Sequence, residues 1–235
     1  MIVTDKKQTP QEIFNTIAPN YDYMNNVISL GTHKAWRKKV AKTMPIPKGS
    51  YVLDLCCGTA DWTIHHAQTV GPSGHVVGLD FSENMLKIAD QKVSQLHLNK
   101  EISLVQGDAM ATTYPDNTFD YVTIGFGLRN LPDKIAGLKE MYRVLKPGGS
   151  VIILETSQPD NPLVRPAWRF YFSKVMPLLG KVLTKQQAEY KYLDETTEKF
   201  MSYQELVDVM TEIGFKDVKF ERYNLGAAAA HFGTK

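Results

Sequence analysis

Four aspartates end or follow short apolar runs in the first half of the chain, where carboxylates could hold a cationic or hydroxyl-bearing ligand. Asp54 and Asp61 flank the loop CCGTAD, Asp80 ends the run HVVGLD, and Asp108 follows ISLVQ. A single aspartate at the end of a strand is as often a turn or N-cap residue. Four of them at ligand-facing positions favour a binding site at one edge of a sheet.

The loop CCGTAD indicates which ligand class fits this site. Gly58 stands alone where a dinucleotide-binding loop would carry G-x-G-x-x-G, the pattern that lets backbone N–H groups approach a pyrophosphate. Its absence argues against a phosphate-bearing ligand. Asp80, 22 residues after Gly58, lies where an acidic residue can bind a ribose diol. A cationic ligand with a ribose and an adenine fits this set, and S-adenosylmethionine is such a ligand.

Cys56 and Cys57 are the only cysteines of the chain. Adjacent cysteines rarely form a disulfide, and a metal site needs three or four ligands, usually with C-x-x-C spacing. We therefore expect no metal site and two small side chains packed beside the glycine loop. The alternative is a metal or redox protein in which His65 and His66 contribute, and elemental analysis of the purified chain would test it.

Apolar runs alternate with amphipathic segments between residues 51 and 155. The pattern predicts strands at 51–55, 75–80, 102–106, 119–126 and 150–155. It predicts helices from about residue 62, over 82–96 with Ser82 as N-cap, and over 133–145, the last ended by the turn KPGG. This alternation is typical of an α/β fold with a doubly wound, mostly parallel sheet and helices on both faces.

The two ends of the chain have a different pattern. Residues 202–214 predict a helix with a capping box formed by Ser202 and Glu205, and two closing strands in a hairpin-like, antiparallel pair follow it. We expect one domain over residues 1–235. Residues 1–45 would form an N-terminal helical flank, and residues 159–200 would form a helical insertion on the substrate side.

The composition agrees with a single soluble domain. The 235 residues are 43% hydrophobic and 22% charged, and the net charge of +2 is too small to predict a nucleic-acid partner. No apolar stretch approaches the roughly 20 residues that span a bilayer, and the N-terminus lacks the apolar core of a signal peptide. We expect a cytoplasmic protein with reduced thiols.

Longer segments resemble the methyltransferases of menaquinone and ubiquinone biosynthesis, most closely those that act on demethylmenaquinone. The similarity runs from about residue 14 to the end of the chain. The segments that carry it include YDYMNNVISLGTHKAWR, VLDLCCGTADW, GFGLRN, ETSQP and the terminal HFGTK. The resemblance implies the class I fold of S-adenosylmethionine-dependent methyltransferases. It further implies transfer of the methyl group to a ring carbon of demethylmenaquinol, giving menaquinol.

The resemblance also implies which residues bind the methyl donor. These are Thr59, Asp80, Asp108 and Ala109, and we expect Asp54, Gly58 and Phe81 to complete the donor site. Asp108 stands where many relatives carry asparagine, and both residue types can accept a hydrogen bond from the adenine amino group. Relatives often have glycines in place of Cys56 and Cys57, which favours a need for small side chains over a need for sulfur.

The implied chemistry needs a quinol, because a ring carbon becomes nucleophilic only when a neighbouring hydroxyl gives up its proton. By resemblance Arg129 is the first catalytic candidate, for phenolate stabilisation or for orienting a water. A salt bridge to Asp133 or Glu155 is its structural alternative. Tyr21 and Asn130 are candidates for cofactor closure and substrate orientation, or else a packed aromatic and a turn residue.

The base that takes the proton is not identified by the sequence. His33 and His231 can titrate near neutrality and are candidates, although a lone histidine is more often structural.

A prenylated naphthoquinol carries a long apolar tail, which some surface of the protein must accommodate. The aromatic and basic stretch from Trp168 to Leu183 suits a membrane surface or an apolar channel, and equally a helical cover of the sheet. The basic run HKAWRKK fits anionic lipid or a solvated helix face. We therefore expect peripheral contact with the inner face of the cell membrane and carry a homodimer as a further expectation.

Two alternative functions remain open at this stage. One is a class I methyltransferase for another small molecule or for the ubiquinone precursor. The other is a non-catalytic scaffold that binds S-adenosylmethionine or a membrane.

Overall fold

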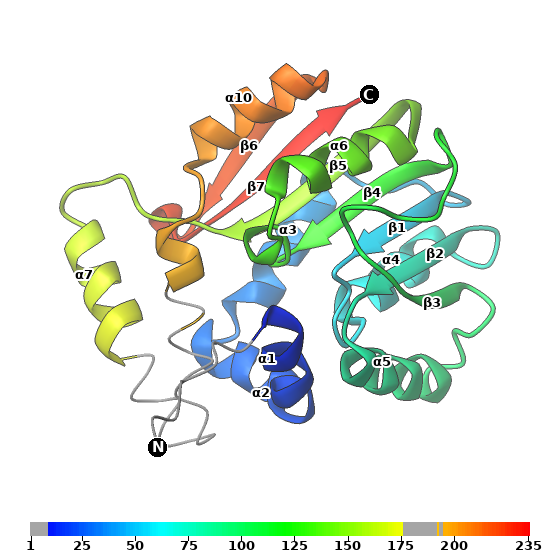
Figure 1. The fold of residues 1–235 in the computed structure, drawn as a ribbon, viewed down its shortest axis with the longest axis horizontal. Helices are drawn as coiled ribbons and strands as arrows, with labels where there is room; N and C mark the ends of the chain where they lie inside the picture. The colour runs from blue at the N-terminus through cyan, green and yellow to red at the C-terminus, as the bar shows by residue number, and fades with distance from the viewer. Residues whose placement is uncertain (1–8, 176–191, 193–194) are drawn as a thin grey trace, which may run out of the picture.

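A seven-stranded sheet forms the centre of the structure (Figure 1). The structure, a computed structural model, describes residues 9–175, 192 and 195–235. The strands are β1 (Tyr51–Leu55), β2 (His75–Asp80), β3 (Ile102–Gln106), β4 (Phe119–Gly125), β5 (Leu145–Thr156), β6 (Lys216–Tyr223) and β7 (Ala228–Thr234). Their order is β3-β2-β1-β4-β5-β7-β6, with the first five parallel and β7 antiparallel to both β5 and β6. The predicted mostly parallel sheet with an antiparallel C-terminal pair is confirmed.

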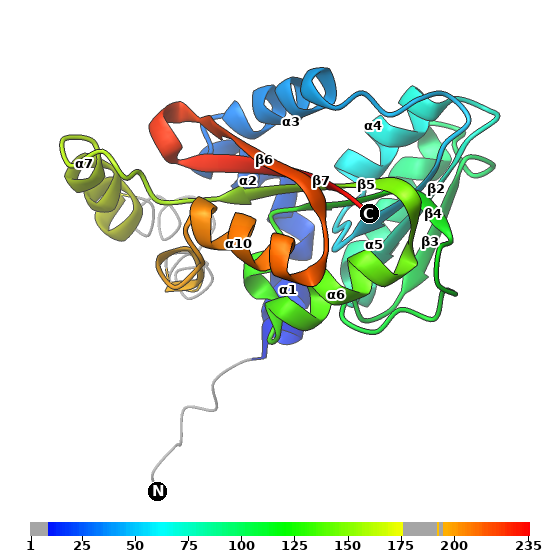
Figure 2. The ribbon, with the colours of Figure 1, turned by 90° about the horizontal axis from the view of Figure 1, so that it is seen from above.

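Helices cover both faces of this sheet (Figure 2). They are α3 (Thr32–Thr43), α4 (Asp61–Val70), α5 (Glu83–Gln95), α6 (Lys134–Val144) and α10 (Tyr203–Ile213). One hydrophobic core joins the strands to α6 and α10 through Leu138, Met141 and Leu206. The other core joins them to α3, α4 and α5 through Trp36, Ala67 and Val93. The structure is therefore the predicted doubly wound arrangement.

The sequence signals at the helix ends take the expected form. Ser82 Oγ accepts a hydrogen bond from the Met85 N–H at 3.2 Å and caps α5. Ser202 and Glu205 form the predicted capping box of α10, and Gly214, with φ +115°, ends that helix in the left-handed region. These caps fix where each helix begins relative to the preceding strand or loop.

The segment KPGG differs from the prediction. The helix α6 ends at Val144 as expected, but β5 begins at Leu145, five residues before the predicted strand. The physical reason is an irregular pairing: Leu145 lies opposite Phe119, Ser150 lies opposite Tyr121, and the register shifts between them. The extra residues form a bulge. Gly148 N–H donates to the Lys235 carbonyl at 2.9 Å, so the C-terminus also holds this bulge.

The N-terminal flank contains α1 (Pro10–Ile17), a 3-10 turn (Ala18–Asn20) and α2 (Tyr21–Ile28), followed by α3. Ile17, Ala18 and Met24 form a separate apolar cluster with Met85 of α5. The insertion after β5 begins with α7 (Arg165–Phe170) and a π-helical turn (Tyr171–Val175). Residues 165–175 of the predicted insertion are thus helical, and residues 176–191, 193 and 194 lie outside the described residues.

Candidate active site

The carboxyl ends of β1 to β4 meet where the strand order reverses, with β1 between β2 and β4. In such sheets ligands bind beyond this edge. A cavity of about 610 Å³ lies here, a size typical of small-molecule sites. Its wall includes Gly58, Asp80, Phe81, Met85, Asp108 and Met110. We call it the carboxylate cavity.

Asp80 is the central carboxylate of this cavity. It is buried, and its two oxygens accept hydrogen bonds from the Gly58 N–H at 2.8 Å and from the Ser82 N–H at 2.9 Å. Burial raises the pKa of Asp80, and these backbone donors oppose the shift. Each carboxylate oxygen has a further lone pair, so Asp80 can hold the glycine loop and still accept from two hydroxyls of a ligand.

Asp108 supplies the second carboxylate and is exposed at the cavity. Its Oδ1 accepts from the Met110 N–H at 2.8 Å, an interaction that fixes the turn after β3. Ala109 in this turn and Phe81 after β2 also line the cavity. Of the predicted donor-binding residues, the structure thus brings together Gly58, Asp80, Phe81, Asp108 and Ala109.

Asp54, Thr59 and Asp61 are not among the residues that line the carboxylate cavity. Asp54 is buried behind the loop and accepts from the hydroxyls of Thr63 and Thr123, both at 2.7 Å. Its burial raises the pKa to about 6. This placement corrects the expectation that all four aspartates face a ligand, because a residue that ends a strand can point into the sheet as well as out of it.

Thr59 and Asp61 belong to a polar network instead. Lys92 Nζ of α5 lies 3.0 Å from Thr59 Oγ1, 2.7 Å from Asp61 Oδ1 and 2.5 Å from Asp22 Oδ2. Thr59 also donates to Asp22 at 2.6 Å. This network joins α2, at the residue after Tyr21, to the glycine loop, to the start of α4 and to α5.

The two cysteines pack against Gly127, which follows β4, and Gly78, which lies in β2. A Cβ at Gly127 would lie 2.5 Å from the Cβ of Cys56, and a Cβ at Gly78 would lie 3.1 Å from Cys57 Sγ. Burial, with the nearby carboxylates, raises the pKa of both thiols well above the usual range. No group of three histidine, cysteine or acidic side chains suited to a metal occurs among the described residues. The side chains fill close-packed positions beside the loop.

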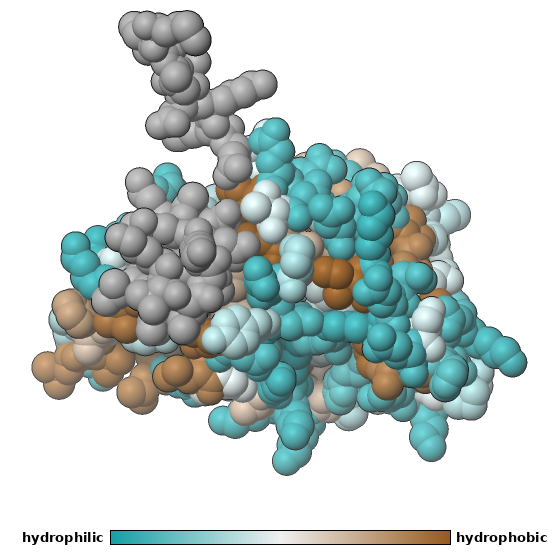
Figure 3. All heavy atoms as spheres, turned by 90° about the horizontal axis from the view of Figure 1, so that it is seen from below, coloured by the Kyte–Doolittle hydropathy of each residue, from teal (hydrophilic) through white to brown (hydrophobic). Residues whose placement is uncertain are grey.

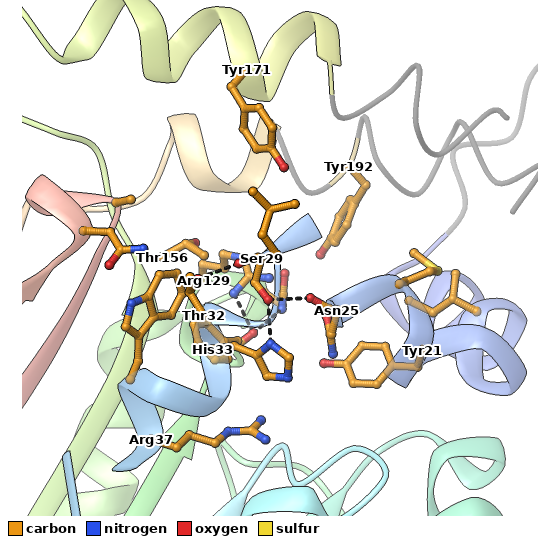
Figure 4. A pocket seen from close by; sticks show the side chains of 18 of the residues that line it. Tyr21, Asn25, Ser29, Thr32, His33, Arg37, Arg129, Thr156, Tyr171 and Tyr192 are labelled. Carbon is orange, nitrogen blue, oxygen red and sulfur yellow. Dashed lines mark hydrogen bonds between the residues drawn. The ribbon is translucent and has the colours of Figure 1, made fainter. Parts of the chain in front are cut away.

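A second cavity, of about 230 Å³, lies under the N-terminal helices (Figure 4). Its wall is rich in aromatic rings, and we call it the aromatic cavity. It includes Phe14, Tyr21, Trp36, Phe126, Trp168 and Tyr192. Polar groups enter this wall from α2 and α3, among them Asn25, His33 and Arg37. An apolar enclosure with a few convergent polar groups suits an aromatic ring that carries oxygen substituents.

Four of the described residues line both cavities: Phe14, Tyr21, Phe126 and Asn130. Tyr21 lies close to the glycine loop, since a Cβ at Gly58 would be 3.5 Å from its ring. Burial raises the pKa of the Tyr21 phenol, and a hydrogen bond from Asn25 opposes that shift. Asn130 Nδ2 donates to the Phe126 carbonyl at 3.1 Å, while its Oδ1 is buried without a partner among the described residues.

Arg129 lies in the wall of the aromatic cavity and forms a buried ion pair with Glu155, which was one of its two predicted structural partners. Its Nη1 also donates to the Phe126 carbonyl at 2.7 Å, and its backbone N–H donates to Glu155 Oε2 at 3.1 Å. These contacts fix the 3-10 turn Leu128–Asn130, which presents Asn130 to both cavities.

The two candidate bases lie in different places. His33 lines the aromatic cavity, and burial together with Arg37 and Lys34 lowers its pKa to about 4. His231 lies in β7, outside the wall of either cavity, and its Nε2 is 2.9 Å from the Tyr203 carbonyl oxygen. Of the two, only His33 can meet a ligand in these cavities.

Sequence reasoning missed Phe14 and Phe126 as parts of the shared wall. Phe14 lies at a helical spacing that predicts packing and nothing more. Phe126 has φ +60°, a strained backbone conformation for a residue with a side chain. Cys56 and Ala60 also have positive φ angles. Such strain gathers at functional sites, but backbone angles of this kind are not readable from residue types alone.

The comparisons with known proteins decide the family. The profile of the ubiE/COQ5 methyltransferase family matches residues 2–235. The chain belongs to the ubiE/COQ5 methyltransferase family. Demethylmenaquinone methyltransferase from Lactiplantibacillus plantarum is 56% identical over 96% of this chain and 95% of its own length. The enzyme of the same name from Staphylococcus carnosus is 50% identical over 98% and 94% of the two chains.

The fold is also that of solved methyltransferases. A SAM-dependent methyltransferase from Aquifex aeolicus has 20% identity and a TM-score of 0.61, over 84% of this chain and 88% of its own. Within the family, the carboxylate cavity offers what S-adenosylmethionine requires. Asp80 and Asp108 supply acceptors for hydroxyl and amino groups, and Phe81, Met85 and Met110 supply apolar surface for an adenine.

Proposed function

We propose that this chain transfers a methyl group from S-adenosylmethionine to a ring carbon of demethylmenaquinol and so forms menaquinol. The observation that carries the proposal is the pair of cavities with a shared wall. One cavity has carboxylates at the strand ends, the other is aromatic, and Phe14, Tyr21, Phe126 and Asn130 lie between them. Two different ligands bound in these cavities would meet at this wall.

In this proposal residues 1–235 act as one methyltransferase unit. Residues 1–45 are its N-terminal flank, and residues 159–200 are the substrate-side insertion. Gly58, Asp80, Phe81, Asp108 and Ala109 contact the donor. Asp54 and Thr59 act from behind the loop, through the hydrogen bonds described above.

The bound donor supplies an electrophilic methyl group on a sulfonium, and the residues of the chain must supply position and charge. Asn130 Oδ1, which lacks a partner among the described residues, can accept from a substrate hydroxyl. Tyr21 closes the wall above the glycine loop and excludes water from the point of transfer. The guanidinium of Arg129 has N–H donors and no acceptor, so it orients the substrate oxygen or a water and does not act as a base.

Exposed apolar side chains near the aromatic cavity offer a surface for the prenyl tail. Leu30 in the cavity wall is 76% exposed, and Leu163 (87%), Phe170 (64%) and Leu225 (73%) are also exposed. Asn224 and Ala227, on either side of Leu225, line the cavity, as do Trp168 and Tyr171 around Phe170. Apolar residues gather at this end of the molecule in Figure 3. We propose that the tail leaves the cavity here.

No helix of the described residues is long and apolar enough to span a membrane. The proposal therefore includes peripheral contact, at the inner face of the cell membrane, through Leu163, Phe170 and Leu225. Replacement of all three with serine should reduce sedimentation with anionic vesicles. Equal sedimentation of the variant and the wild type would contradict this contact. The expected homodimer is tested by light scattering, where the mass of a single chain would exclude it.

Product analysis on two acceptors tests the proposed substrate against the ubiquinone precursor. The purified chain with S-adenosylmethionine is offered a short-tailed demethylmenaquinol and the corresponding benzoquinol in parallel. We expect a ring-methylated product mainly from the naphthoquinol. Methylation of the benzoquinol alone would assign the chain to the other branch of the family. Binding of the donor without methylation of either acceptor would favour the non-catalytic alternative.

A further inference from the structure

Ser29 and His33 form a close pair in the wall of the aromatic cavity. His33 lies in the first turn of α3, and its Nδ1 is 2.5 Å from the Oγ of Ser29, which precedes this helix. Both residues line the cavity, and the histidine is buried. The pair is therefore placed to meet a ligand ring.

The hydrogen bonds of Ser29 fix the tautomer of His33. Ser29 Oγ carries one proton and donates it to the Asn25 carbonyl at 2.7 Å. The serine oxygen can then only accept from His33, so Nδ1 carries a proton. The low pKa of His33 keeps the ring neutral, which leaves a lone pair on Nε2.

This second nitrogen is available to a ligand. The contact with Ser29 is made by Nδ1, and the hydrogen bonds of the described residues leave Nε2 to a ligand. In Figure 4 the edge of the imidazole away from Ser29 faces the space between Tyr21 and Arg37. A substrate ring in the aromatic cavity would thus meet Nε2, which can accept a hydrogen bond but cannot donate one.

We propose that Nε2 of His33 accepts a hydrogen bond from a ring hydroxyl of the substrate and so selects the hydroquinone over the quinone. The inference rests on the proposed function and adds the group that recognises the reduced state. A hydroquinone offers an O–H donor to Nε2. A quinone offers only a carbonyl oxygen, so two lone pairs would face each other and Nε2 would gain no hydrogen bond from the substrate.

Binding of small aromatic probes to the full-length chain tests this recognition without turnover. The probes are 1-naphthol, which has a hydroxyl donor, and 1-methoxynaphthalene, which has none. We expect the wild type to prefer 1-naphthol about fivefold, the ratio that corresponds to one hydrogen bond of about 1 kcal/mol. His33→Leu should remove the preference, and His33→Gln, which keeps an acceptor, should retain most of it. An equal preference in the wild type and His33→Leu would overturn the inference.

Nitrogen NMR of the wild type labelled at histidine keeps the inference testable if the leucine variant does not fold. We expect the His33 signal to show an unprotonated Nε2 that shifts when 1-naphthol is added and does not shift with 1-methoxynaphthalene. Ser29→Ala should allow His33 to adopt either tautomer and should therefore weaken the preference for 1-naphthol. A protonated Nε2 in the wild type would overturn the inference.

The outcomes separate this inference from the function on which it rests. If the protein methylates the quinol but binds both probes equally, the proposed role of His33 is wrong and the proposed reaction is supported. If the protein prefers 1-naphthol but does not methylate the quinol, the proposed reaction is wrong and the recognition of a hydroxyl by His33 is supported.

Discussion

At the scale of single residues, the Arg129–Glu155 pair holds the turn that presents Asn130. Glu155→Gln keeps the shape of the side chain and leaves the buried guanidinium without a compensating charge. We expect the free energy of unfolding in urea to fall by about 3–5 kcal/mol. We also expect methyl transfer to fall more than tenfold, because Asn130 loses its fixed position.

A matched control for this variant is Arg222→Gln, which breaks the exposed pair of Arg222 with Asp160. It should leave the urea midpoint nearly unchanged, since exposed ion pairs contribute little. A Glu155→Gln variant as stable as this control would contradict the structural role of the buried pair.

The aspartates show how far residue types can predict a site. Asp80 and Asp108 line the carboxylate cavity as expected, whereas Asp54 and Asp61 are engaged elsewhere. The sequence places each aspartate near the end of a strand. It does not reveal that Thr123, 69 residues after Asp54, supplies a hydroxyl from the neighbouring strand. Such tertiary partners decide which carboxylate is left for a ligand.

At the scale of elements, Lys92 of α5 forms an ion pair with Asp22 of α2 and adds to the apolar contact of Met85 with Met24. Lys92→Met would remove its contacts with Asp22, Thr59 and Asp61 and loosen the helix that carries Tyr21. We expect the KM for S-adenosylmethionine to rise about fivefold, because ion pairs of this partial exposure contribute up to about 1 kcal/mol. Steady-state kinetics with a saturating quinol measures the change.

Lys87→Met provides the control on the same helix. Lys87 pairs with Glu83 and is 63% exposed, whereas Lys92 is 25% exposed. Its replacement should leave KM unchanged. If both variants gave the same KM as the wild type, the Lys92 network would not position the site.

Element type was predictable where periodicity or capping is local. The strand 51–55 and the capping box of α10 follow from neighbouring residues alone. The early start of β5 was not predictable, because Pro and Gly in KPGG indicate a turn. The bulge there depends on Phe119 and on the C-terminal Lys235, which are distant in sequence. Contacts of this range have no local signal.

At the scale of the whole molecule, buried neutral histidines make the fold sensitive to acid. Burial lowers the pKa of His66 to about 3 and the pKa values of His33 and His231 to about 4. Below the ordinary histidine pKa the unfolded chain therefore binds more protons than the folded chain, so stability is lost as the pH falls from about 6.5 to 4. Asp54, whose pKa burial raises to about 6, and Asp80, whose pKa burial also raises, act in the opposite direction, since each binds its proton more tightly in the folded chain.

Three histidines against two aspartates leave about one net proton in this range. We expect the free energy of unfolding to rise by about 1 kcal/mol per pH unit between pH 4.5 and 6. Urea unfolding at several pH values measures the slope, and His66→Leu should flatten it. Maximal stability near pH 5 would contradict this account.

The central claim for the whole molecule is that the two cavities bring a methyl donor and a reduced naphthoquinol to one wall. The most direct test incubates the chain with S-adenosylmethionine and a short-tailed demethylmenaquinone, with and without a chemical reductant, and analyses the products by mass spectrometry. We predict a ring-methylated product only with the reductant. Equal product without the reductant, or no product with it while the donor is bound, would contradict the claim.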